Sequence, residues 1–221
     1  EPSVVASYRT VRRRHDVVSP RQLQPGIRWK AYDEHRPIGW INGIDVGSGN
    51  PVLVPRARLD LDWSRTHADT GLFLATSNGL ASGNTRAEAL CHALFEVVER
   101  DAEWRWNRLT ARARDATAIR LDSVEVPLLR GLLNQFSDAR ISASVWDMTS
   151  EVGVPTYSCS IGDADPFGGL RTFGGSGCHL SKDIALARAL TEAAQSRLTF
   201  IAGSRDDLFP DEYDRRLEEA N

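Results

Sequence analysis

The chain has 221 residues, of which 41% are apolar and 26% charged, a composition typical of a water-soluble globular domain with a sizeable core. Its net charge of -3 gives no electrostatic reason for binding nucleic acid or an anionic membrane, and no apolar run approaches the roughly 20 residues that span a bilayer. Three widely spaced cysteines and an amino terminus without an apolar signal segment favour a cytoplasmic protein with reduced thiols.

The first third of the chain shows short β-rich runs. Strands are expected at 4–8, 40–46 and 52–54. The last two are separated by Gly47-Ser48-Gly49-Asn50-Pro51, a run of turn-forming residues, so the sequence predicts a β-hairpin here. A passage rich in loops follows over residues 62–84.

The rest of the chain combines long helices with short strands. Helices are expected at 85–108, 127–136 and 181–202, and strands at 141–146 and 155–161. Because helices and strands do not alternate regularly, the sequence predicts an α+β fold rather than a doubly wound α/β fold. We expect a mixed or antiparallel sheet packed with two long helices.

The predicted helix at 85–108 is strongly amphipathic, with Asn84 as its expected N-cap. On a helical wheel one arc is apolar and contains Ala87, Leu90, Leu94, Phe95, Val97, Val98 and Ala102. Four acids gather within about 80° on the opposite side, namely Glu88, Glu96, Glu99 and Glu103. His92 sits among these acids and Arg100 flanks the row, but no Lys or Arg lies between them.

A solvated polar face is the commonest explanation for such a row. However, the neighbours Glu96/Glu99 and Glu99/Glu103 each destabilise an isolated helix by about 0.2–0.5 kcal/mol. A divalent cation would relieve this repulsion, and Mg²⁺ prefers carboxylate oxygens, which it commonly bridges to substrate phosphates. Arg100 could then bind a phosphate or hold a carboxylate in a bidentate pair.

The helix at 181–202 carries a weaker polar pattern. Glu192 and Gln195 are three residues apart and share a face, with Arg188 one turn earlier. Ordinary surface polarity is the simpler interpretation of these three residues from the pattern alone.

Two longer motifs resemble signatures of the YcaO family. The first runs from Ser77 to Leu90 (Ser-Asn-Gly-Leu-Ala-Ser-Gly-Asn-Thr-Arg-Ala-Glu-Ala-Leu) and continues in Glu96-Val97-Val98-Glu99-Arg100-Asp101-Ala102. The second is Ala-Leu-Thr-Glu-Ala-Ala-Gln-Ser-Arg at 189–197, at about the expected distance. Weaker similarity covers most of residues 27–207, so the resemblance predicts a YcaO-like fold.

The resemblance implies an enzyme that uses ATP and Mg²⁺ to modify peptide backbone amides. Phosphorylation of the amide oxygen would make it a leaving group. Attack by a Cys, Ser or Thr side chain would then give an azoline, and attack by an external sulfide would give a thioamide. The implied substrate is a peptide or protein, such as a bacteriocin-like natural product. An accessory partner, TfuA-like or leader-peptide-binding, and a homodimer are also compatible with the resemblance.

Matched position by position, the resemblance also implies the site residues. The residues that would bind ATP are Asn84, Glu88, Arg100, Glu192 and Gln195, and those that would bind Mg²⁺ are Glu88, Glu96 and Glu99. It assigns no catalytic residue.

The chain departs from the family pattern in two places. Nothing before Asn84 matches the family's Ser-x-x-Glu-x-x-Glu motif, which supplies the other side of the nucleotide site, and the family's carboxyl-terminal segment is not matched either. We therefore expect residues 1–221 to be an incomplete domain from the centre of a longer enzyme, with weak or absent ATPase activity alone. The alternative hypothesis is a non-catalytic domain that binds a peptide or a partner protein and has a solvated acidic helix face.

Overall fold

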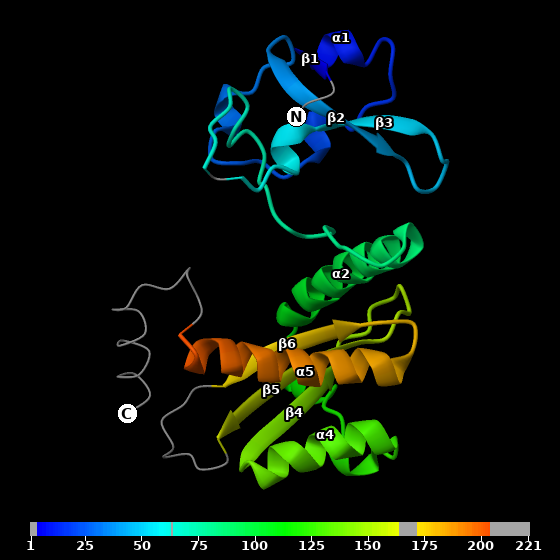
Figure 1. The fold of residues 1–221 in the computed structure, drawn as a ribbon, viewed down its shortest axis with the longest axis vertical. Coiled ribbons are helices and arrows are strands. Elements are labelled where there is room, and N and C mark those ends of the chain that lie inside the picture. The colour runs from blue at the N-terminus through cyan, green and yellow to red at the C-terminus, as the bar shows by residue number, and fades with distance from the viewer. Residues whose placement is uncertain (1–3, 63, 164–171, 204–221) are drawn as a thin grey trace. The chain divides into compact units, whose positions relative to one another are not determined.

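A computed structural model describes residues 4–62, 64–163 and 172–203, and the chain divides into two compact units, 1–77 and 78–221 (Figure 1). The described residues of each unit contain one three-stranded antiparallel sheet. The predicted α+β class, with antiparallel sheets and two long helices, is confirmed. None of the helices in these described ranges is long and apolar enough to cross a membrane.

The first unit is built on β1 (Val4–Ser7), β2 (Pro37–Ile44) and β3 (Pro51–Pro55), in that order across the sheet. The predicted hairpin is confirmed. At its tip the side chain of Asp45 accepts hydrogen bonds from the backbone nitrogen and the hydroxyl of Ser48, at 2.7 and 2.8 Å. Gly49 has a φ of 75°, a conformation that glycine adopts without steric cost.

The core of the first unit surrounds Trp40 of β2, which is completely buried. Its indole nitrogen donates to the carbonyl of Ala6 at 2.9 Å, so the polar atom is satisfied inside the core. The other buried apolar residues are Val11, Ile38, Leu53, Ala57, Leu72 and Phe73. The short helix α1 (Tyr8–Val11) was not expected from the sequence.

The second unit pairs β4 (Ile141–Asp147), β5 (Thr156–Asp163) and β6 (Phe173–Cys178). Its helices are α2 (Arg86–Asn107), α3 (Ala111–Asp115), α4 (Pro127–Asp138) and α5 (Lys182–Ile201). All five elements predicted in this region are present, with end points that shift by a few residues. Strand β6 and the one-turn helix α3 were not predicted.

Helix α5 lies unusually close to β6. A Cβ atom added at Gly177 would come within 2.6 Å of the backbone nitrogen of Ala189, and one added at Gly175 would meet the backbone of Ala193. Ala185, Ala189 and Ala193 follow one another at four-residue spacing along α5, and all three are fully buried. Two glycines and a row of alanines therefore let the helix and strand backbones touch.

Helix α2 covers the opposite face of this sheet. Side chains alternate between the two faces of a strand, and Val145 of β4 packs with α4 and α5 in the main core. Its neighbour Trp146 points the other way and contacts Trp106 of α2, with ring centroids 5.9 Å apart. Strand β6 therefore has α5 on one face and α2 on the other (Figure 1).

The start of α2 corrects one sequence prediction. The N-cap is Thr85 rather than Asn84, because the Thr85 hydroxyl accepts the hydrogen bond from the backbone nitrogen of Glu88 at 3.2 Å. Glu88 reaches back and accepts a hydrogen bond from the backbone nitrogen of Asn84 at 2.7 Å. This reciprocal arrangement resembles a capping box shifted by one residue.

Burial along α2 also differs from what its amphipathic pattern suggests. Of its residues only Glu99 and Ala102 are buried. The apolar side chains of Leu90, Leu94 and Val97 are 38%, 48% and 47% exposed. The acidic side of the helix therefore packs toward β6, and much of the apolar arc faces outward.

Candidate functional site

Charged residues from α2 and α5 converge at β6. Helix α2 supplies Glu99, Arg100 and Glu103, and α5 supplies Arg188 and Glu192, which influence the ionisation of Glu99 from the second helix. Ala189 and Ala193 of α5 pack directly against the glycines of β6. Arg188 and Glu192 precede these alanines in the helix, so the close packing holds both charged residues beside the strand. We call these five residues the β6 cluster.

Arg100 links the two acids of α2 within the β6 cluster. One of its terminal nitrogens lies 3.4 Å from a Glu99 oxygen, and the other lies 2.8 Å from a Glu103 oxygen. Glu99 has only 6% of its surface exposed, whereas the Arg100 side chain is 42% exposed. Arg100 can therefore hold these carboxyl groups and still present its outer edge to solvent or to an anion.

The carboxyl group of Glu99 is the most perturbed acid in the β6 cluster. Burial raises its pKa to about 7, and the positive charge of Arg100 opposes this rise. The negative charge of Glu192 raises it further, and Arg188 also opposes the rise. A bound cation would favour the ionised carboxylate, so Glu99 is poised to lose its proton when positive charge arrives.

Glu192 is held at the same place by the backbone of β6. Burial raises the pKa of its carboxyl group, while Arg100 and a hydrogen bond from the backbone nitrogen of Ser176 lower it. Strand β6 stands at one end of the described sheet, so this backbone nitrogen is available to a side chain from α5. The β6 cluster holds three carboxyl groups and two guanidinium groups.

Glu88 and Asn84 lie at the other end of α2. The backbone nitrogen of Asn84 lowers the pKa of the Glu88 carboxyl group, and the amide side chain of Asn84 approaches it at 3.5 Å. Eleven residues separate Glu88 from Glu99, which corresponds to about 16 Å along a helix. The two carboxylates therefore cannot bind the same Mg²⁺ ion, whose ligands lie about 2.1 Å away.

The remaining predicted residues, Glu96 and Gln195, lie one helical turn from members of the β6 cluster. Glu96 is half-buried on α2, one turn before Glu99, and Gln195 is exposed on α5, one turn after Glu192. Among the residues that the structure describes, no three His, Cys, Asp or Glu side chains are gathered closely enough to hold a metal ion by themselves. Any ion bound by Glu96 or Glu99 would need further ligands, such as phosphate oxygens and water.

Sequence reasoning missed the contribution of β6 to this site. Ser176 binds Glu192 through its backbone, and burial raises the pKa of the Cys178 thiol, with Glu99 raising it further. The only signal was the alternation of Gly175 and Gly177 with small polar residues, which is weak because glycine is disfavoured in strands. Arg188 and Glu103 were visible in the sequence pattern, although no role was assigned to them.

Comparison with protein families matches residues 1–221 to the model described as "YcaO cyclodehydratase, ATP-ad Mg2+-binding". The chain is also similar to the "uncharacterized protein in tfuA 3'region" of Rhizobium leguminosarum bv. trifolii, with 39% identity over 187 residues. That match covers 81% of this chain and 44% of the relative. The chain thus spans less than half the length of this curated relative.

Solved structures share the fold at lower sequence identity. A heterocyclase in complex with substrate and cofactor aligns with a TM-score of 0.76 and 23% identity, covering 97% of this chain and 30% of that protein. The YcaO protein of Methanopyrus kandleri, bound with AMPPCP and Mg²⁺, aligns with a TM-score of 0.61 and 23% identity. That alignment covers 93% of this chain and 50% of the archaeal protein.

Proposed function

Because this chain belongs to the YcaO family, we propose that its full-length protein uses ATP and Mg²⁺ to activate backbone amides of a peptide. The description of the family names both ligands. The family match and the β6 cluster both lie within residues 1–221, and the proposed activity is that of the full-length protein.

The observation that carries the proposal is the pair of acids formed by the buried Glu99 and the half-buried Glu192. The pKa values of these two carboxyl groups, on separate helices, remain raised although Arg100 and Arg188 lie beside them, so a further cation would favour the ionised carboxylates. Carboxylate oxygens are the ligands that Mg²⁺ prefers, and guanidinium groups such as Arg100 and Arg188 suit phosphate oxygens. The residues present therefore fit a nucleotide with Mg²⁺.

The same observation weakens the alternative of a solvated acidic face. That hypothesis requires the acids of α2 to point into water, and Glu99 is 94% buried because only 6% of its surface is exposed. A buried acid that no function requires would be replaced at little cost by an apolar residue.

We propose distinct roles for the two ends of α2. At the β6 cluster, Glu96 and Glu99 would bind Mg²⁺ together with phosphate oxygens and water, while Arg100 and Glu192, aided by Gln195, would contact the nucleotide. At the start of the helix, Glu88 and Asn84 would contact another part of the nucleotide or a second ion, because of the distance along the helix. The bound nucleotide would supply the phosphoryl group that makes an amide oxygen a leaving group.

The chemistry that follows would depend on the nucleophile. After transfer of a phosphoryl group from ATP to the amide oxygen, a Cys, Ser or Thr side chain of the peptide would attack the amide carbon. The oxygen would then leave with the phosphate, and loss of a proton would give an azoline. An external sulfide attacking the same carbon would give a thioamide. The charged groups of the β6 cluster would stabilise the transferring phosphate.

The substrate would be a peptide or protein, and a heterocyclase that shares this fold has been solved in complex with substrate and cofactor. The relative from Rhizobium is named for its position beside tfuA, which supports a TfuA-like accessory partner for this protein. We also propose that residues 1–221 are an incomplete domain that hydrolyses ATP weakly when isolated.

Titration calorimetry on the full-length protein tests the proposal. We expect AMPPCP with Mg²⁺ to bind to the unmodified protein and the Glu99→Gln and Glu192→Gln variants to bind it at least tenfold more weakly. Glu125→Gln, which changes an exposed acid before α4, is the matched control and should bind normally. Equal binding by all four proteins would disprove the assignment of the β6 cluster.

A further inference from the structure

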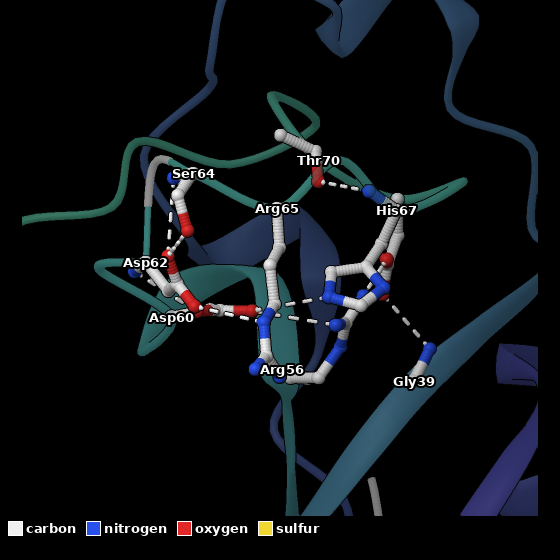
Figure 2. Close-up of polar contacts among 9 residues, drawn as sticks. Gly39, Arg56, Asp60, Asp62, Ser64, Arg65, His67 and Thr70 are labelled. Carbon is white, nitrogen blue, oxygen red and sulfur yellow. Dashed lines mark hydrogen bonds and ion pairs between the residues drawn. The ribbon is translucent and has the colours of Figure 1, made fainter. Parts of the chain in front are cut away.

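A second group of charged residues lies in the first unit, between β3 and Phe73. Arg56, Asp60, Asp62, Arg65 and Asp69 come together there, with Ser64 and His67 beside them (Figure 2). None of them belongs to the motifs that relate the chain to its family. We call these five charged residues the Arg56 group.

The innermost pair of the Arg56 group has a structural role. Arg56 and Asp69 have side chains that are 8% and 4% exposed, and they form a buried ion pair. Asp69 also accepts a hydrogen bond from the backbone nitrogen of Gly39 at 2.9 Å, which ties the pair to β2. These two charges neutralise one another inside the fold.

The outer members of the Arg56 group are accessible and carry excess negative charge. The side chains of Asp60 and Asp62 are 27% and 45% exposed, and that of Arg65 is 74% exposed. Arg56 also lies 3.3 Å from Asp60, and Arg65 lies 3.2 Å from Asp62, so the Arg56 group as a whole sets three carboxylates against two guanidinium groups. Hydrogen bonds from Ser64 lower the pKa of Asp62, so this acid stays ionised at neutral pH.

Two cavities meet at this charged wall. The first has a volume of about 270 Å³ and apolar walls that include Ile27, Phe73 and Leu74. The second has a volume of about 290 Å³ and is lined by Ile41, Leu59 and His67. Arg56, Asp60, Asp62 and Arg65 line both cavities.

The walls of this double cavity contain an exposed apolar side chain and a buried polar atom without a hydrogen-bond partner. The Ile27 side chain, at its rim, is 97% exposed. Within the described part of the chain, the Nε atom of Arg56 is buried without a hydrogen-bond partner, which costs the free energy of taking it out of water. An exposed apolar rim together with an unsatisfied buried donor is typical of a binding site.

We propose that the two cavities bind an extended segment of the peptide substrate, with a bulky apolar side chain in the first cavity and a basic side chain at Asp60 and Asp62. This inference rests on the proposed function, which makes a peptide the substrate. Successive side chains of an extended peptide point in opposite directions, so neighbouring residues can enter cavities on the two sides of one wall. Each volume lies just below the roughly 300 Å³ at which pockets for whole small molecules begin, and is large enough for a single side chain.

Binding of short capped peptides to the full-length protein without ATP tests this assignment. The probes are acetyl-Gly-Phe-Arg-Gly-amide, the same peptide with Ala in place of Phe, and the same peptide with Glu in place of Arg. Titrations followed by NMR chemical shifts give the affinities. We expect the Phe-Arg probe to bind most tightly of the three.

Variants at the two cavities sharpen the test. Ile27→Ser should weaken binding of the Phe-Arg probe about fivefold and should leave the Ala-Arg probe nearly unchanged. Asp62→Asn should weaken the Phe-Arg probe about threefold, and Asp62→Lys should reverse the preference between Arg and Glu probes. Asp16→Asn, another exposed acid of the same unit, is the control and should bind as the unmodified protein does.

The outcomes separate this inference from the proposed function. If the protein modifies peptides with ATP but the probes do not bind, or the variants leave the order of affinities unchanged, the cavities are not the peptide site. If the probes bind as expected but no ATP-dependent modification of any peptide is found, the proposed function fails and the cavities remain a peptide-binding site.

Discussion

The negative charge of Glu192, on α5, raises the pKa of the Glu99 carboxyl group, which lies on α2. These helices cover opposite faces of the second sheet, so the two acids meet beside β6. Glu99 and Glu192 are 93 positions apart in the chain, so no local sequence pattern predicts that they lie close together. Their proximity is a tertiary property and gives the candidate site its excess of carboxyl groups.

The raised pKa of Glu99 predicts a pH-dependent stability. Because the folded-state pKa of about 7 lies above the ordinary value of 4.5, the folded chain retains a proton that the unfolded chain releases. In EDTA, stability should therefore fall as the pH rises from about 4.5 to about 7 and then level off. Urea unfolding at pH 5 and pH 8 measures this change.

Glu99→Gln removes the titrating group of this prediction and should flatten that part of the pH profile. Glu125→Gln should retain it, because Glu125 is an exposed acid elsewhere in the same unit. Parallel profiles for the unmodified protein and Glu99→Gln would contradict the raised pKa.

Removal of the charge of Glu192 should lower the pKa of Glu99. In Glu192→Gln the amide can still accept the hydrogen bond from Ser176, so the main change is the loss of a negative charge near Glu99. Carboxyl ¹³C chemical shifts, followed through a pH titration without Mg²⁺, report this pKa. An unchanged titration midpoint would mean that the two carboxyl groups do not interact.

The close contact of β6 with α5 predicts opposite effects for two glycine substitutions. Gly177→Ala would place a Cβ atom 2.6 Å from the backbone nitrogen of Ala189 and should destabilise the protein by about 1–3 kcal/mol. Gly131→Ala, in α4, meets no atom within 4 Å and should stabilise it by about 0.5–1 kcal/mol. Urea unfolding of both variants measures the difference, and equal stabilities would exclude the proposed backbone contact.

The corrected N-cap of α2 predicts unequal effects of neighbouring substitutions. Thr85→Ala removes the hydroxyl that accepts the Glu88 backbone hydrogen bond and should cost about 1 kcal/mol. Asn84→Ala should cost less, because alanine keeps the backbone nitrogen that binds the Glu88 carboxylate at 2.7 Å. If Asn84→Ala proves the more damaging change in thermal unfolding, Asn84 is the cap after all.

The elements that the sequence predicts well are those with strong local signals. The hairpin between β2 and β3 depends on its turn residues, and α2 and α5 depend on long periodic patterns. The N-cap prediction at Asn84 was wrong by one residue because Asn and Thr are both good caps, and the structure shows that the Thr85 hydroxyl makes the capping hydrogen bond.

What the sequence could not predict depends on long-range packing. Strand β6 is a strand because β5 pairs with it and α5 packs on it, although its glycines disfavour that conformation. The burial of Glu99 could not be predicted from the helical wheel either, since a wheel shows which residues share a face but not which face is covered. The family motifs supplied the candidate residues, and the fold brings Glu99, Arg100 and Glu192 together.

The contact between Gly177 and Ala189 also limits how this part of the protein can vary. Any side chain at Gly175 or Gly177 would push α5, and with it Arg188 and Glu192, away from the strand. The alternate positions, Ser176 and Cys178, point to the other face, where α2 lies. Changes of specificity by mutation of β6 would thus arise at these two residues or at Gly174, which shares their face and where an added Cβ atom would come no closer than 3.9 Å to its nearest neighbour.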